Sequence, residues 1–132
     1  MSYRLTYLAA IVSSTLTSRV AAQPARPDPL GTWRGTSICQ VRPSACHDEN
    51  VVYRITRTTT RDSLAIDGRK IVDAKEVEMG ILACRFDAPS ARLTCTIPNG
   101  VWQFTIHGDS LVGELRQPDG TKVRDVRTKR SR

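Results

Sequence analysis

Four potential metal ligands follow one another at Cys46-His47-Asp48-Glu49. A zinc site needs thiolate, imidazole or carboxylate groups that converge on one point. Neighbouring side chains of an extended segment point to opposite faces, so these four do not converge. The other histidine, His107, stands in a predicted tight turn and has no ligand spacing to His47. We therefore expect no metal site and interpret this segment as a solvated acidic loop end.

No motif for catalysis stands out in the chain. Nucleophilic catalysis requires a nucleophile, a base and an orienting group within mutual reach. Serines and threonines are scattered, and the sequence contains neither a Gly-x-Ser-x-Gly elbow nor a phosphate-cradling glycine loop. The sequence leaves acid–base work by a pair of carboxylates open. We expect a protein that binds rather than reacts, and one without a cofactor.

The aromatic residues suggest a binding function. Trp33, Tyr53, Trp102 and Phe104 are joined after residue 22 by only one other aromatic residue, Phe86. One interpretation is that they line a ligand cavity, because barrels of about eight strands can hold one small ligand. The other is that they are the core of a barrel filled by its own side chains. The cavity interpretation assigns its walls to Tyr53, Trp102 and Phe104, with the Tyr53 hydroxyl seeking a partner.

The first 22 residues resemble a signal peptide. Arg4 supplies the positive charge, the segment from Leu5 to Leu16 carries none, and Val20-Ala21-Ala22 offers small residues for cleavage. The uncharged run is shorter than a membrane-spanning helix requires. We therefore expect residues 1–22 to be removed, leaving a secreted or periplasmic protein without a transmembrane segment. Residues 23–29 are rich in proline and predict an extended lead-in, and residues 30–130 predict a single domain.

The periodicity after residue 30 is two rather than 3.6, and turn dipeptides recur. This pattern predicts an all-β fold, an antiparallel meander of about eight strands that closes into a small barrel. Three hairpins have a predicted register. In the first hairpin the expected pairs are Asp87 with Arg92, Phe86 with Leu93 and Leu82 with Ile97. In the second they are Trp102 with Leu115, Phe104 with Gly113 and Ile106 with Leu111. In the third, across a one-residue bulge, they are Leu115 with Val123 and Glu114 with Arg124.

The first of these hairpins also predicts a disulfide. Its four-residue loop places Cys84 opposite Cys95, where cross-strand Cβ atoms come within about 4.5–5.5 Å. Export favours disulfides, and a Cys39–Cys46 bridge is then the remaining pairing. Four cysteines allow three connectivities, so a free or cross-paired arrangement of Cys39 and Cys46 stays open.

The N-terminal part of the domain has a less definite pattern. Residues 31–40 and 51–59 predict strands. The segment from Ser63 to Met79 predicts a hairpin whose turn falls at Asp67-Gly68 or at Asp73-Ala74, and the sequence does not decide between them.

Gly31-Thr32-Trp33 opens the first predicted strand and resembles the Gly-x-Trp signature of lipocalins and their calycin relatives. The resemblance implies that Trp33 closes the base of the barrel and that an arginine of the last strand packs across its ring. Arg127 is the best match, since it shares a face with Val123 and Asp125, and Arg124 is the alternative. A guanidinium over an indole contributes roughly 0.5–2 kcal/mol. The chain looks like a compact lipocalin-like barrel of the bacterial type.

Basic residues accumulate at the C-terminus. The formal charge is +7, or about +5 once Arg4 and Arg19 leave with residues 1–22, and Lys122–Arg132 holds six basic residues and one acid. This end predicts a solubilising strand, or a contact with an anionic surface or protein partner; nucleic acid is not expected. The leading hypothesis is a lipocalin-like module for a small, largely apolar ligand. The alternative is an interaction protein with a filled core, a hydrolase inhibitor or an envelope-surface factor.

Overall fold

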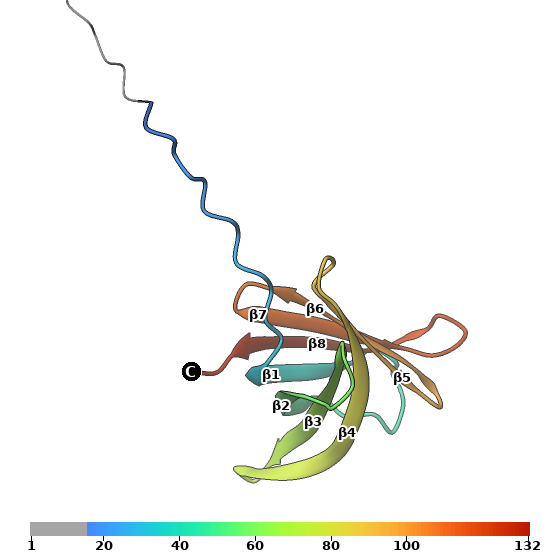
Figure 1. The fold of residues 1–132 in the computed structure, drawn as a ribbon. Helices are drawn as coiled ribbons and strands as arrows, with labels where there is room; N and C mark the ends of the chain where they lie inside the picture. The colour runs from blue at the N-terminus through green and yellow to red at the C-terminus, as the bar shows by residue number, and fades with distance from the viewer. Residues whose placement is uncertain (1–15) are drawn as a thin grey trace, which may run out of the picture.

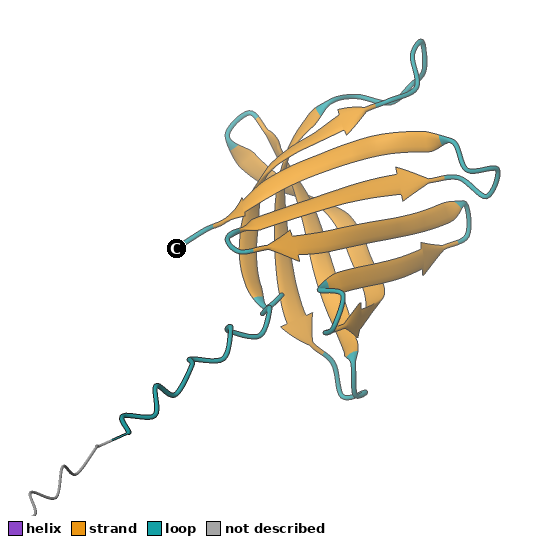
Figure 2. Cartoon of the chain, turned by 90° about the horizontal axis from the view of Figure 1, so that it is seen from above, coloured by secondary structure: helices purple, strands orange, loops and turns teal. Residues whose placement is uncertain are grey.

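The structure is a computed structural model that describes residues 16–132, and its strands form a single closed antiparallel barrel (Figures 1 and 2). Each strand pairs with its neighbour in sequence, and the last closes onto the first, so the predicted eight-stranded meander is confirmed. The strands are β1 (Gly31–Cys39), β2 (Glu49–Arg57), β3 (Ser63–Val72), β4 (Lys75–Asp87), β5 (Arg92–Ile97), β6 (Gly100–His107), β7 (Ser110–Arg116) and β8 (Lys122–Arg130).

The predicted register of the β6–β7 hairpin is confirmed, and that of β4 and β5 is confirmed near their turn. β4 and β5 pair Asp87 with Arg92 and Phe86 with Leu93. Their ladder ends at Arg85 and Thr94, so the predicted pair of Leu82 with Ile97 does not form. β6 and β7 make the three predicted pairs, including Phe104 with Gly113. Alternation of apolar and polar residues fixes these registers, because a slip by one residue would exchange the inner and outer faces.

The turn between β3 and β4 falls at Asp73-Ala74. Both residues adopt positive φ angles, 48° and 61°, as a two-residue turn of type I′ requires. The other candidate, Asp67-Gly68, lies within β3, where Gly68 faces Gly80 of β4. The ladder between the two strands is irregular directly after this pair, between Gly68 and Arg69.

The predicted register between β7 and β8 is wrong by one residue over most of its length. Glu114 pairs with Asp125 and Leu115 with Arg124, and the irregularity lies between Leu115 and Arg116. The sequence predicts a bulge in this hairpin, and one is present. Its position next to Arg116 shifts the partners of Leu115 and Glu114 by one residue from those predicted. As a result, Val126 faces the interior of the barrel and is fully buried.

Two disulfides, Cys84–Cys95 and Cys39–Cys46, are present, so the predicted pairing is confirmed. Cys84 and Cys95 lie in the core, with exposed fractions of 3% and 0%. Cys39–Cys46 joins the end of β1 to the loop that precedes β2.

The expected signal peptide lies mostly outside the described residues. Its last residues, 16–22, are extended and exposed in the structure. Within residues 16–132 there is no helix of the length and apolar character needed to cross a membrane.

Candidate functional site: a cavity opposite the closed end of the barrel

One end of the barrel is closed around Trp33, which is completely buried. The Arg130 guanidinium carbon lies 4.2 Å from the centre of the indole ring. The indole N–H donates to the Pro29 carbonyl at 2.9 Å, and Arg130 donates to the carbonyls of Asp28 and Leu30. The tryptophan and the arginine therefore hold residues 28–30 across this end.

The arginine that covers Trp33 is Arg130, so the assignment to Arg127 is wrong, and so is the alternative Arg124. Arg130 pairs with Trp33 in the β1–β8 ladder. The Arg127 side chain is 78% exposed and contacts Asp125 on the outer surface. Arg124 points inward, but at the opposite end of the barrel, where it donates to Ser37. The signal that identifies the inner face is Val126, the only apolar residue after Val123.

A cavity of about 540 Å³ lies at the end of the barrel opposite Trp33. All three predicted pocket residues, Tyr53, Trp102 and Phe104, line it. The remaining walls come mainly from β4, including Met79, Ile81 and Leu82. The volume falls within the range of about 300–1,000 Å³ that is typical of small-molecule sites.

The three aromatic rings pack against one another. Trp102 stacks on Phe104 with ring centres 5.6 Å apart, and Tyr53 meets Phe104 edge to face at 5.7 Å. Phe104 and Tyr53 belong to the buried core, with exposed fractions of 0% and 4%, whereas Trp102 is half-buried. Trp102 therefore offers the accessible ring surface, and Phe104 and Tyr53 support it from behind.

Polar side chains complete the wall of the cavity. Arg124 donates to the Ser37 hydroxyl at 3.0 Å and lies 3.7 Å from the Glu49 carboxylate. Lys70 approaches the same carboxylate at 3.5 Å. Sequence spacing alone does not place Arg124, Glu49 and Lys70 at the cavity, because it fixes neither the inner face of β8 nor the pairing between β2 and β3. A second carboxylate, Glu78, also lines the cavity, so the two cations of its wall are balanced by two acids.

Burial controls the ionisation of Tyr53. It raises the pKa of the phenol to about 12, against the smaller opposing effects of the Arg124 charge and the Ser37 hydroxyl. The phenol is therefore neutral at physiological pH and keeps its proton as a hydrogen-bond donor.

The cavity lies beside a separation between β4 and β5. These strands pair over only three residues, Arg85–Asp87 against Arg92–Thr94, and the N-terminal half of β4 pairs with β3 alone. Figure 1 shows the β3–β4 hairpin curving away from β5. Three apolar side chains on this part of β4 are exposed: Val77, Met79 and Ile81, the last by 67%.

Cys46 and Asp48, in the acidic segment that leads into β2, make structural contacts. Cys46 is in a disulfide, and Asp48 accepts a hydrogen bond from the Cys39 backbone N–H and pairs with Arg42. Both contacts help to lower the pKa of the Asp48 carboxyl, the backbone hydrogen bond most. In the part of the chain that the structure describes, no three His, Cys, Asp or Glu side chains come close enough to hold a metal ion.

The basic C-terminal strand carries much of its charge beside acids. Lys122 lies between Glu114 and Asp125, at 3.6 and 3.0 Å. Arg130 and Arg132 approach Asp109, at 3.6 and 3.8 Å. A contact of this strand with an anionic partner stays a prediction, and the neighbouring carboxylates weaken the field that would drive it.

No protein-family model and no curated protein matches this chain.

Proposed function

We propose that the protein is an exported, lipocalin-like binding module that takes up a small, largely apolar ligand in the cavity beside Trp102. The observation that carries the proposal is a cavity of about 540 Å³ lined by Trp102, at the barrel end opposite the plug of Trp33 and Arg130. Apolar and aromatic side chains make up about half of its lining residues, and polar and charged groups stand beside them at fixed positions, a combination that small-molecule sites use.

Export is part of this proposal. Two disulfides are stable in oxidising compartments, and the N-terminal pattern of residues 1–22 is that of a cleaved signal.

Native mass spectrometry of the full-length gene product, purified from an exporting host, tests both parts. The measured mass reports cleavage after Ala22, and a mass excess that disappears on denaturation reports a captured ligand. Trp102→Ala removes the accessible ring and should abolish the excess. Gln103→Ala, at the neighbouring outward position, should retain it. Retention of the ligand by folded Trp102→Ala would contradict the assignment of the cavity.

The exposed apolar side chains of β4 favour the second candidate, an interaction protein. Val77, Met79 and Ile81 lie where β4 pairs with β3 alone and its edge toward β5 is open, and such strand edges readily pair with another chain. Ile81→Lys distinguishes the two functions. If the protein binds a protein partner through this edge, Ile81→Lys should abolish association in a pull-down. If it binds a small ligand, the substitution removes only one contact at the mouth of the cavity.

A further inference from the structure

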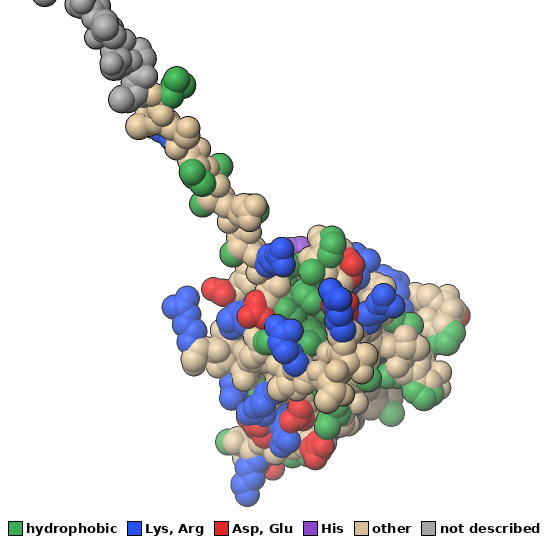
Figure 3. All heavy atoms as spheres, viewed as in Figure 1, with side chains coloured by type: hydrophobic (Ala, Val, Ile, Leu, Met, Phe, Trp, Pro, Cys, Tyr) green, Lys and Arg blue, Asp and Glu red, His purple; other side chains and the backbone are tan. Residues whose placement is uncertain are grey.

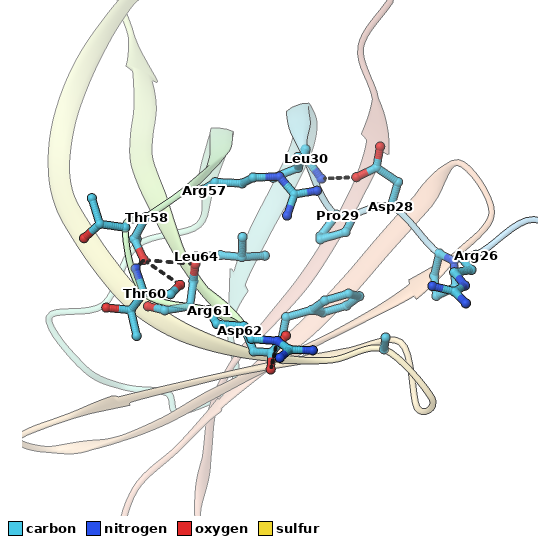
Figure 4. Close-up of a pocket in the computed structure, with 15 residues that line it drawn as sticks. Arg26, Asp28, Pro29, Leu30, Arg57, Thr58, Thr60, Arg61, Asp62 and Leu64 are labelled. Atoms are coloured by element: carbon cyan, nitrogen blue, oxygen red, sulfur yellow. Dashed lines mark hydrogen bonds and ion pairs between the residues drawn. The ribbon is translucent and has the colours of Figure 1, made fainter.

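A second hollow, of about 630 Å³, lies at the closed end of the barrel, away from the cavity beside Trp102 (Figure 4). One wall is the lead-in from Arg26 to Leu30, and the other is the β2–β3 loop from Thr58 to Asp62. Leu64 and Phe86 form an apolar floor between them. We call this hollow the lead-in groove.

Hydrogen bonds fix both walls of the lead-in groove. The lead-in is held by the Trp33 indole and the Arg130 guanidinium, and Asp28 accepts a hydrogen bond from the Leu30 backbone N–H at 3.0 Å. In the opposite wall, the Thr58 hydroxyl donates to the carbonyl of Ser63 at 3.1 Å, and the Phe86 N–H donates to the Asp62 carbonyl at 2.9 Å. The groove is therefore a preformed part of the fold.

The lead-in groove has an excess of positive charge. Arg26, Arg57 and Arg61 line it, against two carboxylates, Asp28 and Asp62. Asp62 approaches Arg61 only at 4.0 Å. Within residues 16–132, Arg57 and Arg26 form no ion pair, and Figure 4 shows the Arg57 side chain reaching from the end of β2 toward Pro29 and Leu30.

The apolar floor and the arginines together define what the groove fits. Figure 3 shows hydrophobic side chains on this face surrounded by Lys and Arg, next to the point where the lead-in meets the barrel. Leu64 is 4% exposed, so the floor is recessed and does not project as a membrane-inserting surface would. A compact apolar group can enter, while a guanidinium pairs with an oxyanion at its edge.

We propose that the lead-in groove binds a small amphipathic anion, an apolar ring or short chain that carries a carboxylate. The apolar part packs on Phe86 and Leu64, and the carboxylate pairs with Arg57, with Arg61 beside it. This site is separate from the cavity beside Trp102, and the proposal does not depend on that cavity being occupied.

The two tryptophans of the chain distinguish the two sites in one experiment. The indole N–H of Trp33 is bonded to Pro29 in the wall of the lead-in groove, whereas Trp102 lines the other cavity. Titration of the ¹⁵N-labelled protein with 2-naphthoate should move the Trp33 indole signal and the amide signals of Thr58–Asp62, saturably. The neutral 2-naphthamide has nearly the same shape and should bind about tenfold more weakly or worse.

Substitutions test which arginine pairs with the carboxylate of the ligand. Arg57→Gln should raise the dissociation constant of 2-naphthoate about tenfold, because Arg57 supplies the paired charge. It removes no ion pair of the fold, and Arg61→Gln is a second variant that should weaken binding in the same direction. Arg127→Gln removes one charge from another face and should have no effect.

Several results would overturn the proposal: no saturable shift with 2-naphthoate, movement of the Trp102 signal alone, equal binding of the amide, or equal weakening by Arg127→Gln. Movement of the Trp102 signal alone would leave the function proposed for that cavity standing. Binding at Trp33 with no captured ligand at Trp102 would support the groove and not the cavity.

Discussion

The Arg130 guanidinium lies 4.2 Å above the indole ring of Trp33, and the same two residues hold the lead-in through its backbone carbonyls. Trp33 is the first aromatic residue of the barrel and Arg130 is the last residue of β8. One contact therefore joins the two ends of the domain and covers one mouth of the barrel.

Loss of this contact should destabilise the fold. Arg130→Ala removes the stacking and two hydrogen bonds to carbonyls, and we expect it to lower the free energy of unfolding by about 1–3 kcal/mol. Arg127→Ala, on the outer surface, should change it by less than about 0.5 kcal/mol. Urea unfolding followed by tryptophan fluorescence measures both. Equal effects of the two substitutions would mean that the contact with Trp33 contributes no more to stability than an exposed ion pair.

The sequence indicated Arg127 in place of Arg130 as the arginine that covers Trp33, and this error shows which strand registers the sequence could not predict. Short-range registers were predictable, because the turn at Ala88–Ala91 and the alternation around Phe86 and Leu93 allow one solution. The register of β8 depends on where a bulge falls, and a shift of one residue exchanges the inner and outer faces. Sequence spacing did not locate that bulge.

The residues of the two candidate sites were likewise predictable from the sequence only in part. The aromatic wall of the cavity was predictable, because large apolar side chains at alternate positions of a strand point inward. Arg124, Glu49 and Lys70 come together only through the pairing of distant strands. The lead-in groove was missed because its walls, from Arg26 to Leu30 and from Thr58 to Asp62, join only when the barrel closes.

The contact between Phe104 and Gly113 predicts a steric effect. A Cβ atom added at Gly113 would lie 2.3 Å from Cδ1 of the Phe104 ring. Because that ring is fully buried, Gly113→Ala should destabilise the protein by about 1–3 kcal/mol. Gly68→Ala is the matched control, since its nearest neighbour would be 3.5 Å away. In thermal unfolding, Phe104→Leu should recover part of the loss caused by Gly113→Ala; additive losses would argue against the clash.

The disulfide between Cys84 and Cys95 lies where β4 and β5 begin to separate. Replacing both cysteines by alanine should cost about 2–5 kcal/mol, since a native bridge of a small domain is lost. The same change at Cys39 and Cys46 should cost less, because those residues close a shorter loop whose intervening residues are exposed. Denaturant midpoints of the two double variants test this order, and the reverse order would show that the separation of β4 from β5 needs no covalent restraint.

Tyr53 predicts a loss of stability at alkaline pH. Its pKa is raised by burial from 10.0 to about 12 in the folded protein, so the folded state keeps a proton that the unfolded chain releases. This stability is complete below pH 10, is lost as the pH rises toward 12, and amounts to on the order of 2–3 kcal/mol.

After residue 22, Tyr53 is the only tyrosine. The phenolate absorbance therefore reports this residue alone and should have its midpoint near 12. Tyr53→Phe should lose less stability than the parent protein between pH 10 and 12. An absorbance midpoint near 10 in the folded protein would mean that the phenol is open to water, and the wall of the cavity would then have to be reassigned.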